Sequence, residues 1–240
     1  MSEYRVAAQF RGPPGTGNGG YVAGRAALLL GDGPAEVTLR RPVPLDTALQ
    51  VQHQAGRALV SDAEGNLIVE ARPASLELEI PAAPTAAEAE AAARWFQATN
   101  FSHSTGQCFC CGTSLAEGFG LRVFSGKVPG RPGIAAALWR PDAAFADANG
   151  HVAPEFLWAA LDCPGQFAFT VDDQPARSLL ARMTARLTGH VEAGEACIVL
   201  GWQIGREGRK LHAGTAILGA DGGLRGVARA LWVMPQPVAS

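Results

Sequence analysis

The sequence predicts an α+β protein built from two similar units, each with one long helix packed on antiparallel strands. Three observations support this prediction: one order of elements occurs twice, an apolar helical stretch begins each repeat, and a turn signal near the end of each repeat joins two alternating strands. At 240 residues, the chain is long enough to bury a core in both units.

The first repeat begins with the apolar stretch GGYVAGRAALLL at 19–30, which predicts a helix. Segments of alternating character follow at 35–45, 48–56 and 57–78 and predict strands. Within the last segment, SDAEGNL places an acidic residue and a glycine between two alternating runs. This pattern is typical of a tight turn between antiparallel strands.

The second repeat has the same order. The apolar stretch APEFLWAALDCPGQFAF at 153–169 predicts one long helix, and alternating segments at 179–194, 195–208 and 210–234 predict strands. The counterpart of the first turn signal is LGADGGL at 218–224. The closing hairpins are therefore the best match between the two halves.

An Ala- and Glu-rich stretch at 83–96 predicts a surface helix between the repeats. Residues 97–133, with many Gly, Cys and Ser, are expected to form a loop with a strand or two. The predicted organisation is therefore an N-terminal unit at 1–82, a linker helix within 83–100 and a C-terminal unit at 101–240.

The composition excludes two classes of partner. The formal net charge is -2, so the basic surface that usually binds nucleic acid or an anionic membrane is not expected. The sequence shows neither a secretory leader nor a run of roughly 20 apolar residues. Five cysteines, an odd number, fit a reducing compartment better than a disulfide framework, and a cytoplasmic location is expected.

Several stretches resemble thioesterase-like proteins of the double hotdog fold, of a type found in actinobacteria, over nearly the whole chain. The stretches that carry the resemblance are GNGGYVAG, CFCCG, GFGLRVF, PEFLWAALDCPG and GRKLHAGTAILGADG. The resemblance implies two hotdog units in one chain, each a long helix on a curved antiparallel sheet. It also implies action on, or binding of, an acyl-CoA.

In hotdog thioesterases of the resembling kind, a backbone N–H at the helix start polarises the thioester carbonyl, and an acid eight residues later drives attack on it. Eight helical residues span about 12 Å, so a partner helix must supply one of the two groups. Here Gly19 is followed at that spacing by Ala27, and Asp162 is preceded by Pro154, which has no N–H. Each half has lost a different component.

The two losses are complementary if the helices pair antiparallel. Gly19 and Gly20 then face Asp162 in one intact site, while Pro154 and Ala27 meet in an inactive one. The resemblance implies that Asp162 activates water or attacks directly, that Gly19 or Gly20 holds the carbonyl oxygen, and that the glycines let the carbonyl approach. Asn18 stands where the family has His, and either assists the carbonyl or holds the loop.

Each of these residues also has a purely structural interpretation. Pro is favoured in the first turn of any helix, glycine-rich stretches are common in tight turns, and Asp162 could end its helix facing solvent. Asp147 and His151 approach motifs of a second thioesterase group and of hotdog enoyl-CoA hydratases, but the spacing departs from both. An Asp that shapes a turn is the commoner meaning there.

Cys108 and Cys111 have C-x-x-C spacing, which raises the question of zinc. Four ligands are needed, no second pair follows, and His103 is the nearest further candidate. We therefore expect no metal, and interpret the segment as a loop that packs on the sheet or borders the ligand channel.

Three cations, Arg206, Arg209 and Lys210, cluster at a predicted turn and could bind the phosphates of CoA. Arg40 and Arg41 form another such pair, and a solvated surface is the alternative for both groups. The tryptophans at positions 158, 202 and 232 are expected in the core, and any one of them could line an acyl channel.

The sequence thus predicts an acyl-CoA thioesterase that needs no cofactor and could form homo-oligomers. Two alternatives stay open. One is a non-catalytic protein that binds acyl-CoA or lipid, and the other is an enoyl-CoA hydratase.

Overall fold

The computed structural model describes residues 3–99, 106–172 and 178–236, and His103 lies outside them. Within these residues, the strands form one antiparallel sheet with the order β1-β3-β4-β5-β2-β8-β11-β10-β9-β7-β6. The strands of the first half are β1 (Glu3–Tyr4), β2 (Ala35–Leu39), β3 (Leu49–Gln54), β4 (Arg57–Ser61) and β5 (Leu67–Pro73). Those of the second half are β6 (Gly126–Lys127), β7 (Ile134–Trp139), β8 (Leu179–Leu187), β9 (Cys197–Glu207), β10 (Lys210–Leu218) and β11 (Leu224–Val233).

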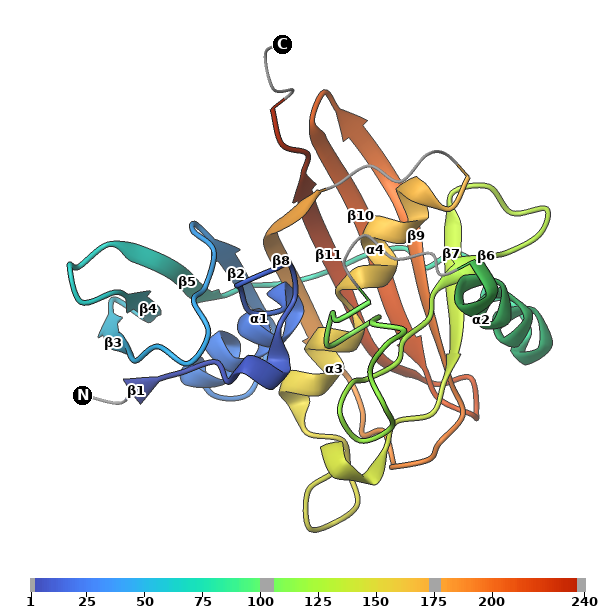
Figure 1. Cartoon of the computed structure of the whole chain (residues 1–240), viewed down its shortest axis with the longest axis horizontal. Coiled ribbons are helices and arrows are strands. Elements are labelled where there is room, and N and C mark those ends of the chain that lie inside the picture. Colours follow the sequence, from blue (N-terminus) through green and yellow to red (C-terminus); the bar gives the residue numbers. More distant parts are fainter. Residues whose placement is uncertain (1–2, 100–105, 173–177, 237–240) are drawn as a thin grey trace.

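The helices lie against this sheet (Figure 1). They are α1 (Gly19–Ala27), α2 (Ala86–Thr99), α3 (Pro154–Ala160) and α4 (Cys163–Thr170), with short 3-10 turns at Ala8–Phe10, Leu28–Leu30 and Ala143–Phe145. The first predicted helix is observed as α1 and the turn that follows it. No helix of the described residues is long and apolar enough to cross a membrane.

Both predicted closing hairpins are present. The first joins β4 to β5 and the second joins β10 to β11, each pair antiparallel. Gly65 and Gly222 have φ of 81° and 77°, in the left-handed region that glycine adopts without steric cost. The turn residues in the sequence therefore predicted both hairpins correctly.

The two halves meet where β2 pairs with β8, the first strand after the helices in each repeat. Val37 lies opposite Met183, and both side chains are fully buried. One hydrophobic cluster contains residues of both halves, so the two units share a sheet and a core.

The expectation of one long helix at 153–169 is wrong, because the helix breaks between α3 and α4. Asp162 lies at the break with φ -79° and ψ -79°. Pro164, two residues later, has no N–H to continue the hydrogen-bond ladder, and its ring would clash with the carbonyl of Ala160 in a continuous helix. Because of the break, the direction of the Asp162 side chain is not set by the regular spacing of one continuous helix.

The predicted linker helix is observed as α2, which packs beside β6 and β7 at the edge of the second half (Figure 1). Its start is capped on both sides, since Thr85 N–H donates to Glu88 at 2.7 Å and Glu88 N–H donates back to Thr85 Oγ1 at 3.3 Å. The segment after α2 contributes β6, and the described part of it is otherwise a loop.

Candidate functional site

Helices α1 and α3 cross in close, antiparallel contact. A Cβ atom on Gly20 would lie 2.5 Å from Asp162 Cβ and 2.7 Å from Trp158 O, and one on Gly24 would lie 2.8 Å from Glu155 Cα. Gly20 therefore allows the approach of the second helix, whereas the sequence suggested that it admits a ligand. The same contact brings the start of α1 to Asp162.

The side chain of Asp162 is 2% exposed and is held by the start of α1. Its Oδ2 accepts hydrogen bonds from Gly20 N at 2.8 Å and from Asn18 Nδ2 at 3.0 Å. Its Oδ1 is buried and has no hydrogen-bond partner among the described residues. One carboxylate oxygen is thus fixed, and the other is unengaged.

Asn18 caps α1 and orients Asp162 at the same time. Its Oδ1 accepts from Tyr21 N at 2.9 Å, while its Nδ2 donates to Asp162 and lies 3.7 Å from Cys108 Sγ. Both ends of the amide are therefore engaged within the protein. The Asn18 amide therefore holds the start of α1 to Asp162, and a contact of Asn18 with a thioester carbonyl stays a prediction.

The N–H of Gly19 differs from that of Gly20. Gly20 N–H is engaged by Asp162, which departs from the expectation that it is available to a ligand. No described residue accepts a hydrogen bond from Gly19 N–H, and Gly19 lies on the wall of a cavity. The first N–H groups of a helix are partially positive, so this one can bind an oxyanion.

Burial raises the pKa of Asp162 to about 7, from an ordinary value near 3.8. The hydrogen bonds from Gly20 and Asn18 oppose this shift because they favour the ionised form, whereas the nearby Cys108 adds to it. A carboxyl with a pKa near neutrality can both take up and release a proton.

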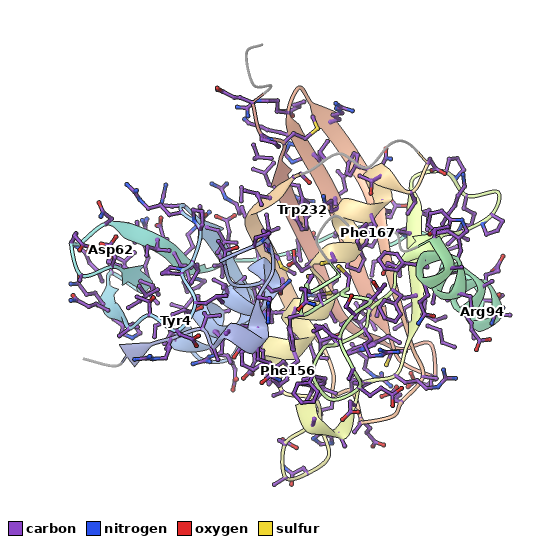
Figure 2. The ribbon with its side chains drawn as sticks, in the orientation of Figure 1. Tyr4, Asp62, Arg94, Phe156, Phe167 and Trp232 are labelled. Carbon is purple, nitrogen blue, oxygen red and sulfur yellow. The ribbon has the colours of Figure 1, made fainter. Side chains whose placement is uncertain are left out.

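The cavity beside Asp162 has a volume of about 490 Å³, within the usual range for small-molecule sites. Its wall includes Asp162, Gly19 and Asn18 together with side chains from both halves of the chain. Apolar members of the wall include Val22, Leu39, Val43, Leu180 and Trp232. Trp232, labelled in Figure 2, is thus the tryptophan of the three that lines the cavity.

Three exposed arginines also line the cavity: Arg40, Arg41 and Arg209. Arg209 is held by a hydrogen bond to Met234 O at 2.8 Å. The other two cations expected there, Arg206 near the end of β9 and Lys210 at the start of β10, do not lie on this wall. Of these three residues, only Arg209 lies on the wall of the cavity, and its binding of phosphate stays a prediction.

The remaining candidates lie away from the cavity. Asp147 is exposed and accepts backbone hydrogen bonds from Asn149 and His151 at 2.8 and 3.0 Å, which lower its pKa and shape a turn. Pro154 begins α3 and Ala27 ends α1, and neither lines the cavity. The hydratase-like pair of Asp147 and His151 is therefore not placed at the cavity.

Sequence reasoning missed Cys163 as a neighbour of the cysteine loop. Its Sγ lies 3.8 Å from that of Cys108, and both residues line the cavity. They are 55 positions apart, so spacing along the chain gave no signal for this contact. A cysteine directly after Asp162 could have been noted, but its partner depends on the break between α3 and α4.

No protein-family model and no curated protein sequence matches this chain. A provisionally named thioesterase from Novosphingobium aromaticivorans is 14% identical, with 98% of this chain and 95% of that chain covered and a TM-score of 0.64. The tesB protein of Mycobacterium avium subspecies paratuberculosis is also 14% identical, with 98% and 96% covered and a TM-score of 0.62. A provisionally named thioesterase II from Thermobifida fusca is 15% identical, with 98% of this chain and 97% of that chain covered and a TM-score of 0.59. The chain has their fold, the α+β double hotdog, as the sequence predicted.

Proposed function

We propose that this protein hydrolyses an acyl-CoA thioester in the cavity beside Asp162. The observation that carries the proposal is the position of Asp162, whose carboxylate is fixed by the start of α1 beside the unengaged N–H of Gly19. A general base and an oxyanion donor at one cavity are the two groups that ester and thioester hydrolysis requires. The names of the similar structures, which include thioesterases, agree with this chemistry.

In the proposed reaction, the thioester carbonyl oxygen accepts a hydrogen bond from Gly19 N–H. Asp162 Oδ1 takes a proton from a water molecule while the water oxygen bonds to the carbonyl carbon. The negative charge that develops on the carbonyl oxygen is stabilised by the N–H and by the positive end of α1. The C–S bond then breaks, and the proton passes from Asp162 to the CoA thiolate.

Asn18 and Gly20 act as positioning residues in this mechanism. Both donate to Oδ2 of Asp162, so Oδ1 is the oxygen left to contact water. Arg209, Arg40 and Arg41 are proposed to bind the phosphates of CoA, since charge-assisted hydrogen bonds to phosphate are favourable at such a wall. The apolar part of the wall is proposed to hold the acyl chain.

The proposal is tested by assaying release of free thiol from acyl-CoAs of increasing chain length, with the parent protein and Asp162→Asn. The amide cannot accept the proton from water, and the rate is expected to fall at least about 100-fold, the usual lower bound for losing a general base. Asp62→Asn is the matched control, because Asp62 lies on the exposed turn after β4 (Figure 2), and full activity is expected.

The outcome also separates the alternatives. A parent protein that binds acyl-CoAs but releases no thiol from any of them is a binding protein, and the hydrolysis proposal fails. Hydration of crotonyl-CoA would instead favour the hydratase. This reaction is measured as a loss of the absorbance of crotonyl-CoA without release of thiol.

A further inference from the structure

A cluster of buried cysteines lies directly beside the proposed site. The Sγ atoms of Cys108, Cys111 and Cys163 all lie within 4.8 Å of one another, and each residue is at most 1% exposed. Cys110 is also buried, but its thiol does not belong to this group of three. Three of the five cysteines of the chain thus have their sulfur atoms close together.

The local backbone is shaped so that Cys108 and Cys111 face the same way. Gly112 N–H donates to Cys108 O at 2.7 Å, which closes a tight turn around the two thiols. A Cβ atom on Gly112 would lie 2.8 Å from Cys108 N, so the turn requires glycine at this position. The C-x-x-C-G segment is therefore a compact structure with two thiols presented together.

The loop that carries these cysteines is anchored independently of the thiols. Phe109 N–H donates to Arg11 O at 2.8 Å, and the Phe109 ring packs on those of Phe10 and Tyr21 with centroids 4.9 and 5.8 Å apart. Cys163 is positioned from the other side, as the first residue of α4. Two rigid parts of the fold thus bring their thiols together.

The spacing matches that of thiolates around a tetrahedral metal ion. With metal–sulfur bonds of about 2.3 Å and tetrahedral angles, neighbouring sulfurs are about 3.8 Å apart. The Cys108 and Cys163 sulfurs are separated by 3.8 Å. Three thiolates select soft or borderline ions such as Zn²⁺ over hard ions such as Mg²⁺.

We propose that Cys108, Cys111 and Cys163 bind one thiophilic divalent ion of the Zn²⁺ class as its three protein ligands. Each thiol that binds loses its proton to solvent as its metal–sulfur bond forms. The ion would tie the loop at 106–125 to the break between α3 and α4. The ion would hold these two parts of the fold together, and the proposal does not depend on thioester hydrolysis.

The test uses the purified full chain, reduced and stripped of metal with a chelator, and then titrated with Co²⁺. We expect one Co²⁺ per chain, with a sulfur-to-cobalt charge-transfer band in the near-ultraviolet that disappears on addition of Zn²⁺. Cys163→Ser is expected to lose most of this band. Cys197→Ser is the matched control, because Cys197 is buried on β9 outside the cluster, and should keep the band at full intensity.

Cys110→Ser is a second control within the same loop, because the Cys110 thiol lies outside the group of three. It should still take up one Co²⁺ with the full band. Because a cluster variant could unfold, thermal unfolding of the parent is measured with and without Zn²⁺, and a rise of several degrees is expected in excess metal. The proposal is overturned if the reduced parent shows no band, if Cys163→Ser keeps it, or if Zn²⁺ leaves the melting temperature unchanged.

Discussion

Gly20 is the residue at which the two helices approach most closely. Replacing it with Ala would bring a methyl group to 2.5 Å from Asp162 Cβ and 2.7 Å from Trp158 O. Although Ala favours helices, this overpacking is expected to lower the free energy of unfolding by about 1–3 kcal/mol, measured by urea denaturation. It should also slow hydrolysis, because Asp162 must move.

Gly205→Ala is the control for this substitution. Nothing lies within 4 Å of a Cβ atom at Gly205, so a change within about 0.5 kcal/mol is expected. A Gly20→Ala protein as stable and as active as the parent would show that the close contact does not hold the site.

The pairing of Asp162 with the start of the first helix was predictable from the sequence. The first half has a glycine at the helix start but no acid, and the second has an acid but Pro154 in place of the donor. The different roles of the Gly19 and Gly20 N–H groups were not predictable from the sequence. Which N–H binds Asp162, and which has no acceptor among the described residues, depends on the side-chain geometry of Asn18 and on how closely the helices approach.

At the scale of elements, the cap of α1 links stability to activity. Asn18→Ala removes the hydrogen bond to Tyr21 N–H and one donor to Asp162. A loss of about 0.5–2 kcal/mol is expected for the cap alone, measured by urea denaturation, together with a large loss of hydrolysis.

Thr85→Ala separates the two effects, because Thr85 caps α2 at the edge of the second half. It should cost a similar free energy of unfolding and leave hydrolysis unchanged. If Asn18→Ala behaves like Thr85→Ala in both assays, then Asn18 is only a helix cap.

Elements with local signals were the ones that sequence reasoning placed well. The hairpin turns at 61–67 and 218–224 contain glycines with positive φ, and the stretch at 19–30 that predicts a helix is apolar except for Arg25. The break between α3 and α4 was missed because the apolar pattern continues through it. Pro164 is a signal for this break, because proline interrupts the interior of a helix. Proline is also favoured in the first turn of a helix, so the signal was ambiguous.

At the scale of the whole molecule, the shared sheet and core predict cooperative unfolding. Met183→Ala removes a fully buried side chain where β8 meets β2, and a cost of about 2–5 kcal/mol is expected. Calorimetry should show a single transition, shifted as a whole, because neither half has its core to itself.

Ile204→Ala is the control, since Ile204 on β9 is 43% exposed and should matter much less. Two separate transitions, of which only one shifts in Met183→Ala, would contradict a single cooperative core.

The sequence predicted the order of helices and strands in each repeat. It did not predict the pairing of β2 with β8, because two strands that lie far apart in the sequence carry no local signal that identifies their partner.

We propose that the thioester carbonyl binds at the start of α1 beside Asp162. The most direct test is a crystal structure with an acyl-CoA analogue in which a methylene group replaces the thioester sulfur. The carbonyl oxygen is expected about 3 Å from Gly19 N, with the carbonyl carbon facing the Asp162 carboxylate. An analogue bound elsewhere, or with its carbonyl turned away from Gly19, would contradict it.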